Sequence, residues 1–482
     1  MMGLKARVFK THTHVNLEQL IPQNNFYRQL ETKLDLSFVR TLVADTYASF
    51  GRPSIDPIVF FKLQLLMFFE GIRSERLLLK QAHLQLAWRW YLGYDLDEVL
   101  PDHSSLTKIR MRYGLAIFQR FFERVVGLCT QAGLVWGQEL HFDSTVSEAN
   151  ADYDKSVPRF YWNAQQHLGA LFEGEGTTDG QPPAEIVTPT DAQTDAYFVG
   201  KYSGHERMVA ESSYQRQVDY MVNPTDPNAS PMGQGKLGYR THYVVDGGKA
   251  RIILGCLVTP TTIQDNTPML DLAWRLRFRW QLPLDRVVGD SKFGTIPNIV
   301  GLEDNGVKAF TPAHASKAGR SKGVFPKSAF VYDAKNDCYL CPQGETLPRR
   351  RADDKAQAFV YYATRKVCGA CPLKSQCTSN RWRQISRSYH QEYLDRVAAY
   401  QKTPAYQKAM RKRQVWIEPK FAESKLWHHG RRFRWRGIQK VNIEALLRAT
   451  GQNLKQWLKK RTKFAPLPPS KAQALAVARH FS

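Results

Sequence analysis

The sequence predicts an α/β protein with a helical N-terminal region and a small cysteine-rich insertion. Apolar residues recur at helical spacing over about residues 16–135, whereas short apolar runs of strand length begin near residue 137. Five of the seven cysteines lie between residues 338 and 377. At 482 residues the chain is longer than one hydrophobic core usually covers, so about two to four domains are expected.

The N-terminal region, residues 1–135, is predicted to be helical and to serve DNA binding or dimerisation. Residues 57–69 are dense enough in apolar side chains for a buried helix. This longest apolar stretch is interrupted by Lys62 and Gln64 and is too short to cross a bilayer. No apolar segment typical of a signal peptide opens the chain, so a cytoplasmic protein without a membrane partner is expected.

A helix is predicted over residues 104–129, with His103-Ser104-Ser105 as its N-terminal cap. Its first turns carry three basic residues that suit a helix in contact with DNA: Lys108, Arg110 and Arg112. A helical bundle with an ordinary basic exterior explains the same residues equally well.

Strands are predicted from residue 138 onward. The first covers 138–146, and a hairpin with strands at 238–246 and 250–258 turns at Gly247-Gly248. A helix, a strand, a helix and a strand follow at residues 266–279, 285–289, 296–304 and 307–311. The segment 148–236 is polar and rich in Gly, Pro, Thr and Asp, so we expect an irregular or partly disordered insertion.

These patterns divide the chain into consecutive parts. They are the helical region 1–135, the first part of the α/β core 136–311 with its insertion 148–236, the cysteine-rich insertion 312–385, a basic helical part of the core 386–463, and a C-terminal tail 464–482.

The charge indicates a polyanionic partner. The chain has a net charge of +24, and residues 408–463 alone hold 17 Lys or Arg against three Glu. Aromatic residues are interleaved with these cations, which is typical of a nucleic-acid groove. A solvated basic face is the plainer alternative.

Three acidic residues stand in settings that favour metal binding. Asp143 and Asp290 are expected at the ends of strands, and Glu418 lies in the basic segment on a predicted helix. Carboxylates can hold two divalent ions for phosphoryl transfer, and such hard oxygen ligands suit Mg²⁺ or Mn²⁺. Each acid alone is weak evidence, because Asp at strand ends and turns is common.

The surrounding motifs strengthen the case. They are His-Phe-Asp-Ser-Thr at 141–145, Val-Val-Gly-Asp-Ser-Lys-Phe-Gly at 287–294, and Ile-Glu-Pro-Lys-Phe-Ala-Glu-Ser-Lys at 417–425. The element order resembles a ribonuclease-H-like fold, in which the first and fourth strands are neighbours. The motifs resemble those of DDE transposases of bacterial insertion sequences, in the IS1182-like group among IS4/IS5-type relatives, over most of the chain.

The resemblance implies that Asp143, Asp290 and Glu418 bind two Mg²⁺ or Mn²⁺ ions; Glu423 is the rival third acid. It implies cleavage at the terminal inverted repeats of the transposon, followed by attack of the freed 3′-hydroxyl on target DNA. Two transposon ends must be paired, so a homodimer or higher homo-oligomer is expected. The protein would be bacterial and associated with the nucleoid.

The resemblance also assigns DNA contacts. Glu418 and Lys425 keep the spacing of the related IS4-type signature, whereas its Arg and Tyr positions fall on Gln414 and Arg411. Arg413 is a substitute for the missing arginine, and Pro419 predicts that Glu418 lies at a helix start or kink. Lys425 is expected to contact a phosphate near the cleaved bond. Four arginines are expected to clamp the DNA backbone: Arg431, Arg432, Arg434 and Arg436. The pair His428-His429 is expected to touch DNA.

The cysteine cluster predicts a structural metal site. Cys338 and Cys341 form one CxxC pair and Cys368 and Cys371 a second, with Cys377 six residues further on. Thiolates at this spacing can bind a tetrahedral Zn²⁺ and staple an insertion that lacks a core of its own. Five candidates for four positions leave the ligand set open. Reduced unligated thiols and an iron–sulfur cluster are the alternatives.

Two other functions fit the same sequence. One is a DNA-binding protein derived from a transposase that has lost catalysis, although intact acids crowded together without metal would be costly. The other is a metal-dependent nuclease that hydrolyses DNA without joining strands.

Overall fold

The computed structural model describes residues 14–48, 50–51, 54–173, 221–233, 235–312 and 324–461. The chain divides into two compact units. The first unit comprises Met1–Thr267, Phe278–Leu282 and Gln414–Ser482, and the second comprises Pro268–Arg277 and Pro283–Arg413.

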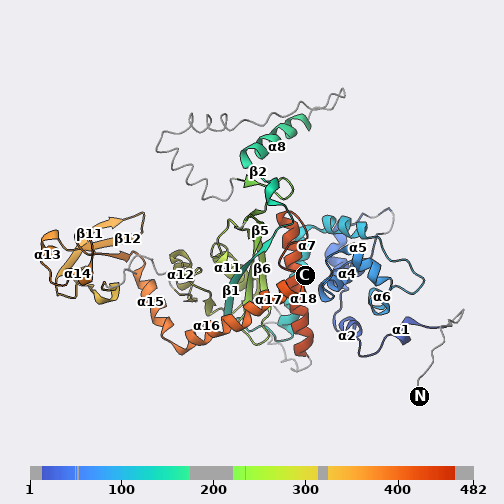
Figure 1. Ribbon diagram of the computed structural model, residues 1–482. Helices are drawn as coiled ribbons and strands as arrows, with labels where there is room; N and C mark the ends of the chain where they lie inside the picture. Colours follow the sequence, from blue (N-terminus) through green and yellow to red (C-terminus); the bar gives the residue numbers. More distant parts are fainter. Residues whose placement is uncertain are drawn as a thin grey trace, which may run out of the picture. The chain divides into compact units, whose positions relative to one another are not determined.

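The N-terminal region of the first unit is helical, as predicted (Figure 1). Its helices are α1 (Leu17–Leu20), α2 (Phe26–Lys33), α3 (Phe38–Val43), α4 (Pro57–Phe69), α5 (Glu75–Ala82), α6 (Leu86–Leu92) and α7 (His103–Gln131). The Asp56 carboxylate caps α4 by accepting a hydrogen bond from the Ile58 N–H. Every residue of α4 from Phe60 to Phe68 is buried, which explains its all-round apolar sequence.

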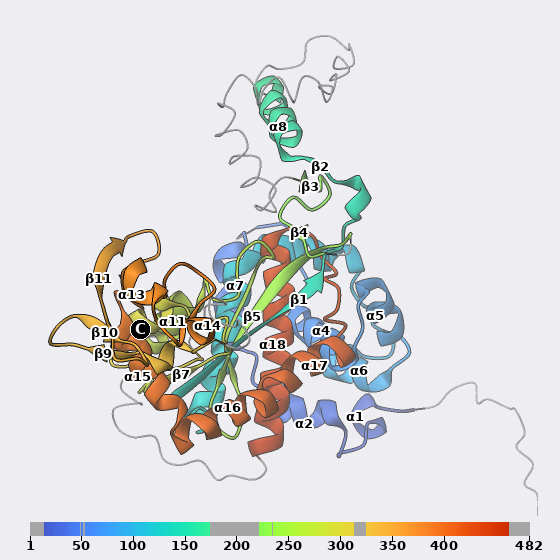
Figure 2. The ribbon, with the colours of Figure 1, turned by 60° about the vertical axis from the view of Figure 1, so that its left-hand side comes forward.

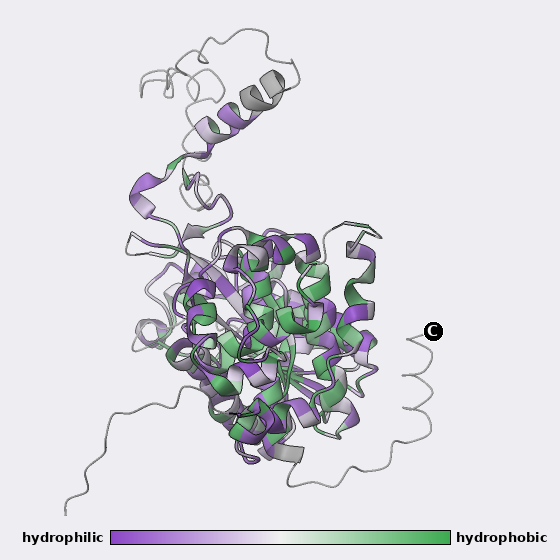
Figure 3. Ribbon diagram, turned by 90° about the vertical axis from the view of Figure 1, so that its right-hand side faces the viewer, coloured by the Kyte–Doolittle hydropathy of each residue, from purple (hydrophilic) through white to green (hydrophobic). Residues whose placement is uncertain are grey.

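Hydrophobic residues are concentrated on the packed helices of this unit, as Figure 3 shows in green. Within the described part of the chain, we find no helix with the length and apolar character needed to span a membrane.

Helix α7 begins one residue earlier than predicted, and its cap is Asp102 rather than His103-Ser104-Ser105. The Asp102 carboxylate accepts a hydrogen bond of 2.8 Å from the Ser104 N–H. A kink interrupts the helix at Gly114, whose φ is 61°. A side chain is strained in this left-handed conformation, so glycine is the residue type that the kink requires.

The strands of the first unit form an antiparallel sheet around β5 (Leu237–Asp246). Strand β1 (Glu139–Glu148) pairs with β5 on one edge, and β6 (Ile253–Pro260) and the short β4 (Ser230–Pro231) pair with it as well (Figure 2). The predicted hairpin is therefore confirmed. Its turn is tight, because a Cβ at Gly247 would lie 2.7 Å from the Glu139 side chain.

The segment between β1 and β5 contains more regular structure than expected. After a short 3-10 turn at Tyr153–Lys155, strand β2 (Val157–Pro158) pairs with β3 (Met221–Val222), and α8 (Arg159–Glu173) follows β2. Residues 174–220 of the predicted insertion lie outside the described residues.

Helix α18 (Ile438–Arg461) packs against α7, β6 and α4 in the first unit (Figure 1). Asn442 accepts a hydrogen bond of 2.8 Å from Val258 N–H and donates one of 2.9 Å to Val258 O. Asn453 makes the same two bonds with Ile253, both of 2.8 Å. Eleven residues of helix and five residues of strand both extend about 16 Å, so the two amides match the spacing of the two strand residues. The helix thereby satisfies buried backbone groups along β6.

The second unit contains a parallel pair of strands, β7 (Arg286–Val288) and β8 (Lys308–Phe310), connected through α12 (Ile296–Glu303). These elements match the predicted strand, helix and strand. Two helices follow later in the chain, α15 (Gln391–Gln401) and α16 (Pro404–Trp416). Tyr406 and Ala409 of α16 pack with Val288 and Phe310, which anchors that helix on the strand pair. The predicted helix 266–279 is α11 (Met269–Trp280).

The cysteine-rich insertion is a five-stranded antiparallel sheet with a core of its own, contrary to the expectation that it lacks one. Its strands are β9 (Val331–Asp333), β10 (Cys338–Leu340), β11 (Thr346–Asp353), β12 (Ala358–Tyr362) and β13 (Gln384–Ser388), in the order β13-β12-β11-β10-β9. The core consists of Phe330, Tyr339, Leu347, Tyr361, Ala363 and Ile385. Two short helices, α13 (Arg365–Gly369) and α14 (Lys374–Cys377), connect β12 to β13.

Candidate active site

Asp143 lies in the middle of β1 rather than at the expected end of a strand, and it is half-buried. Its carboxylate accepts a hydrogen bond of 2.9 Å from the Ser144 N–H. Side chains alternate along a strand, so Asp143 shares one face of the sheet with His141 and Ser147. Its cross-strand partner on β5 is Tyr243, which belongs to the same face.

The Tyr243 ring stacks on the ring of Phe421, with centroids 4.7 Å apart and planes inclined by 7°. Phe421 belongs to α17 (Glu418–Trp427) and follows Glu418 by three residues, or almost one helical turn. Burial raises the pKa of Tyr243, so its phenol stays neutral at ordinary pH. The cross-strand neighbour of Asp143 therefore fixes the first turn of α17.

Two further contacts tie the ends of α17 to the same face of β1. The ring of Trp416, just before the helix, lies 6.1 Å from the ring of His141 between centroids. After the helix, Gly430 O accepts a hydrogen bond of 2.6 Å from the Ser147 hydroxyl. Asp143 lies between His141 and Ser147 along the strand, so the chain runs over its face from Trp416 to Gly430.

Glu418 is the first residue of α17, as Pro419 in the next position predicted. Its side chain is exposed, and within the described residues it makes no hydrogen bond or ion pair. A carboxylate in this setting is available to an incoming ion.

Glu423, the rival acid, is engaged with the protein. Its carboxylate lies 2.5 Å from Lys455 Nζ and 3.6 Å from His428 Nε2, and it accepts a hydrogen bond of 3.2 Å from the Gln452 amide. Burial alone would raise the pKa of Glu423, but its bonds with His428 and Lys455 lower it to about 2. Glu423 therefore links α17 to α18.

Asp290 follows the end of β7 in the second unit and is partly exposed. Its carboxylate accepts a hydrogen bond of 2.8 Å from the Lys292 N–H, which fixes the turn. The guanidinium of Arg413 lies 3.7 Å away and is 12% exposed. Arg413, which the sequence suggested as a substitute for the missing signature arginine, is thus beside a predicted catalytic acid.

Among the described residues, no group of three or more His, Cys, Asp or Glu side chains is arranged to hold a metal ion. Convergence of Asp143, Asp290 and Glu418 on two ions therefore stays a prediction. Three carboxylates repel one another when no cation neutralises them, so their closest approach is expected with the ions bound. Carboxylate oxygens suit Mg²⁺ and Mn²⁺, so the residue types fit these ions.

Arg110 is a correction among the predicted DNA contacts. It is 5% exposed, forms an ion pair with Glu75, and its guanidinium lies 3.9 Å from the centre of the Trp435 ring. It therefore joins the N-terminal helices to the basic segment rather than facing DNA. Lys108 and Arg112 are exposed on α7 and remain predicted contacts.

Arg434 is a second correction. Its guanidinium donates a hydrogen bond of 2.9 Å to Arg73 O, and burial lowers its pKa to about 10. Arg432 and Arg436 are exposed and remain predicted DNA contacts, and they also donate bonds of 3.2 Å to Ala149 O and 2.8 Å to Asn150 O. These contacts stabilise the segment after β1.

Arg431 is exposed, and Lys425 is half-buried on α17. Burial lowers the pKa of Lys425, and the charge of Arg431 acts in the same direction. Neighbouring positive charges of this kind favour an anion, so both residues remain predicted phosphate contacts.

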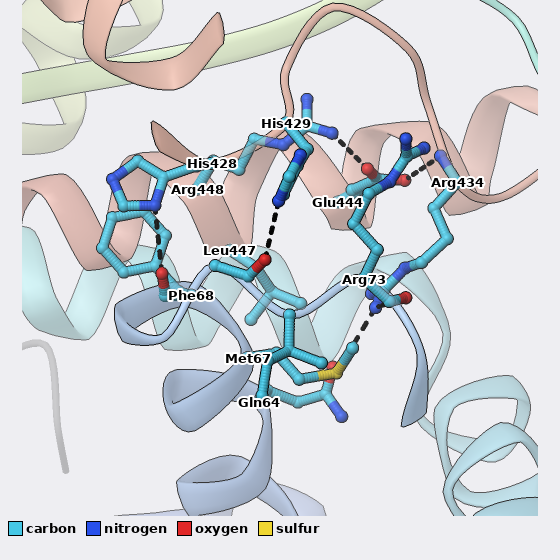
Figure 4. A pocket seen from close by; sticks show the side chains of 12 residues that line it. Gln64, Met67, Phe68, Arg73, His428, His429, Arg434, Glu444, Leu447 and Arg448 are labelled. Carbon is cyan, nitrogen blue, oxygen red and sulfur yellow. Dashed lines mark hydrogen bonds and ion pairs between the residues drawn. The ribbon is translucent and has the colours of Figure 1, made fainter. Parts of the chain in front are cut away.

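His428 packs within the protein, contrary to expectation, whereas His429 is exposed and stays a predicted DNA contact (Figure 4). The ring of His428 stacks on Phe68 with centroids 3.8 Å apart and its Nδ1 donates a hydrogen bond of 3.0 Å to Phe68 O. His429 Nε2 donates one of 2.7 Å to Gly71 O. They close a pocket between α4 and α18, in which Glu444 accepts hydrogen bonds from Arg448 and from the Arg434 N–H.

Two parts of the chain match known protein families. Residues 15–112 match a family described as a transposase domain (DUF772), and residues 340–458 match one described as a transposase DDE domain. The chain carries a DDE transposase domain. That domain belongs to a family of enzymes that cleave and transfer DNA strands, and it implies a ribonuclease-H-like core. Both matched families are described as transposase domains, and such a family implies DNA as a partner.

The DDE transposase domain match includes Glu418 and all the predicted basic contacts from Lys425 to Arg436. It begins two residues after Cys338 and includes the other four clustered cysteines. The N-terminal match includes Lys108, Arg110 and Arg112.

One solved structure is similar to the chain, a cryo-EM structure of the piggyBac transposase synaptic complex with hairpin DNA. The sequences are 9% identical, the match covers 91% of this chain and 81% of that one, and the TM-score is 0.28. A TM-score this low supports no conclusion about fold or function. No curated protein matches the chain.

The contacts of Tyr243 were not found by sequence reasoning. Tyr243 lies in an apolar strand, and nothing in the local sequence distinguishes it from a core residue. Only its register opposite Asp143, a tertiary feature, gives it a place beside the site.

Proposed function

We propose that this protein is an insertion-sequence transposase that binds terminal inverted repeats, cleaves the DNA and joins the 3′ ends to target DNA. Asp143, Asp290 and Glu418 are the proposed ligands of two Mg²⁺ or Mn²⁺ ions. The observation that carries the proposal is the stacking of Tyr243, the cross-strand partner of Asp143, on Phe421 in the first turn of the Glu418 helix.

The contacts of helix α16 support Asp290 as one of the proposed metal ligands. Arg413 lies beside Asp290, and Trp416 lies near His141, two residues from Asp143. Both residues belong to α16 and are three positions apart, so about 4.5 Å of helix separates them. We therefore propose that Asp290 acts together with Asp143 and Glu418 as a metal ligand.

Each residue has a proposed role. Two bound Mg²⁺ ions would supply activation of the attacking hydroxyl and stabilisation of the leaving oxygen. The guanidinium of Arg413, 3.7 Å from the Asp290 carboxylate, would orient that carboxylate. Lys425 follows Glu418 by nearly two helical turns and lies near the same face, where it would hold a phosphate of the cleaved strand.

The basic surfaces supply affinity for the DNA backbone. Lys108 and Arg112 on α7 would bind the transposon end, and Lys425 and Arg431 would bind phosphates near the acids. Pairing of two ends requires at least two protomers, so we propose a homodimer or a higher homo-oligomer.

One assay distinguishes the proposed transposase from a nuclease and from a DNA-binding protein without catalysis. Purified protein is incubated with Mg²⁺, labelled DNA fragments that span the sequences flanking its gene, and target plasmid. Joined products support the proposed transposase, nicks without joining indicate a nuclease, and binding without nicks indicates a DNA-binding protein. The same fragments with scrambled ends control for sequence recognition.

A further inference from the structure

Three of the five clustered cysteines pack against the aromatic core of the small sheet in the second unit: Cys341, Cys368 and Cys377. Cys371 follows Cys368 by three residues, just after the helical turn α13, so it belongs to the same loop. These four cysteines are therefore gathered around one small core.

Cys338 is separated from this group by the geometry of β10. Its neighbour Tyr339 belongs to the core, and side chains alternate along a strand, so Tyr339 and Cys341 share one face while Cys338 has the other. The register agrees, since Tyr339 pairs with the core residue Leu347 and Cys338 pairs with Pro348. Burial raises the pKa of Cys338, and the charges of Asp333 and Asp337 act in the same direction.

The two CxxC pairs therefore differ in backbone conformation, although their sequence spacing is identical. Cys338 belongs to an extended strand, in which residues three apart point to opposite faces. Cys368 lies in the helical turn α13, and Cys371 follows just after its end, so this pair can face one point. Helix α14 then ends at Cys377.

Tight turns hold the backbone at Cys341. Its N–H donates a hydrogen bond of 2.9 Å to Glu345 O, and its carbonyl accepts one of 2.8 Å from the Gly344 N–H. Gly344 has a φ of 84°, a conformation that suits glycine. In the second loop, Cys371 O accepts a bond of 3.2 Å from the Lys374 N–H. These turns fix the two loops that carry the thiols.

We propose that Cys341, Cys368, Cys371 and Cys377 bind one structural Zn²⁺ and that Cys338 takes no part. All five are free cysteines rather than disulfides. Four thiolates complete a tetrahedral site and leave no open position, so the ion would be structural. Among the described residues no group of three or more His, Cys, Asp or Glu side chains is placed to hold a metal ion, so the proposal requires the four thiols to move together when zinc binds.

The small sheet has its own core, so the expected effect of the ion is local. It would join the turn after β10 to the loop that carries α13 and α14, and it would order that loop. The zinc site does not depend on the proposed function, because the observations behind it all come from the cysteine-rich sheet.

The test is the metal content of the full-length protein, purified without metal affinity in reducing buffer and measured by elemental analysis. We expect about one zinc per chain in the wild type and in Cys338→Ser, and loss of zinc in Cys341→Ser and Cys371→Ser. Cobalt substitution should give the absorption bands of a tetrahedral thiolate site in the wild type and in Cys338→Ser.

Several outcomes would overturn the assignment. Wild-type protein without zinc, and with all thiols reactive, shows that the cysteines are unligated. Iron and sulfide in place of zinc indicate a cluster. Loss of zinc in Cys338→Ser places that residue in the ligand set. The wild-type measurement needs no variant, so it stays decisive even if a serine variant fails to fold.

Discussion

The ring of Tyr243 lies against the ring of Phe421 with centroids 4.7 Å apart, and this contact joins the strand opposite Asp143 to the helix that begins at Glu418. Both aromatic residues are buried, and the inclination between the rings is 7°. An aromatic pair of this kind contributes about 0.5–1.5 kcal/mol beyond its burial. The position of the third acid therefore depends on packing between distant parts of the chain.

Phe421→Ala should lower both stability and DNA cleavage. Loss of a buried aromatic side chain costs about 3–5 kcal/mol in the free energy of unfolding, measured by urea denaturation. Cleavage should fall more than the folded fraction accounts for, because the first turn of α17 loses its support. Phe421→Leu is the matched control and should lose less of both. Full cleavage by folded Phe421→Ala would contradict this role.

The two glutamates of α17 should behave differently. Glu418→Gln should abolish cleavage while the free energy of unfolding changes by no more than about 0.5 kcal/mol, because the side chain is exposed and unpaired among the described residues. Glu423→Gln should keep cleavage in the folded fraction and lose stability. An active Glu418→Gln beside an inactive but stable Glu423→Gln would assign the third ligand to Glu423.

The stability contributed by Glu423 should depend on pH. Its pKa is about 2 in the folded protein, against 4.5 ordinarily, so the carboxylate stabilises the fold above about pH 4.5. This contribution is lost as pH falls through the folded pKa. The difference in unfolding free energy between wild type and Glu423→Gln should be at most roughly 3 kcal/mol near pH 7 and should shrink toward pH 2. A difference independent of pH would be inconsistent with the ion pair.

Substitution of Arg110 should affect mainly the stability of the protein, whereas substitution of Lys108 should affect mainly DNA binding. Arg110→Ala leaves the mostly buried Glu75 without its partner, which should cost about 3–5 kcal/mol in unfolding free energy. Lys108→Ala should leave stability unchanged, weaken DNA binding, and reduce the slope of log affinity against log salt by about 1. The reverse pattern would restore Arg110 as a DNA contact.

Asn442→Leu and Asn453→Leu should each destabilise the first unit. Either change leaves a buried N–H and C=O of β6 unpaired, and each unpaired group costs about 1–3 kcal/mol. Gln439→Leu, on an exposed position of the same helix, should change the unfolding free energy by less than about 0.5 kcal/mol. Equal effects in all three variants would show that the amides do not stabilise β6.

The sequence predicted the elements whose signals are local. The apolar run of α4, the Gly247-Gly248 hairpin, the strand that contains Asp143 and the strand that precedes Asp290 all have patterns contained within a few residues. Asn442 and Asn453 could not be predicted, because their partners lie 184 and 200 residues away. In the sequence, a polar residue of a helix gives the same signal whether its side chain faces water or the edge of a strand.

The basic residues show the same limit. Arg110, Arg434 and Lys108 all look like DNA contacts in the sequence, since charge alone does not show which cations have a partner in the protein. Glu75 and Trp435, which bury Arg110, come from other parts of the chain. Likewise, the CxxC spacing could not exclude Cys338, because only the extended conformation of β10 turns it away.

The most direct test of the central claim is a structure of the protein bound to a transposon end in Mn²⁺, with the ions located by anomalous scattering. The account predicts two ions about 3.5–4 Å apart, held by Asp143, Asp290 and Glu418 beside a DNA phosphate. Ions bound by other residues, or a DNA complex in which the three carboxylates remain apart, would contradict it.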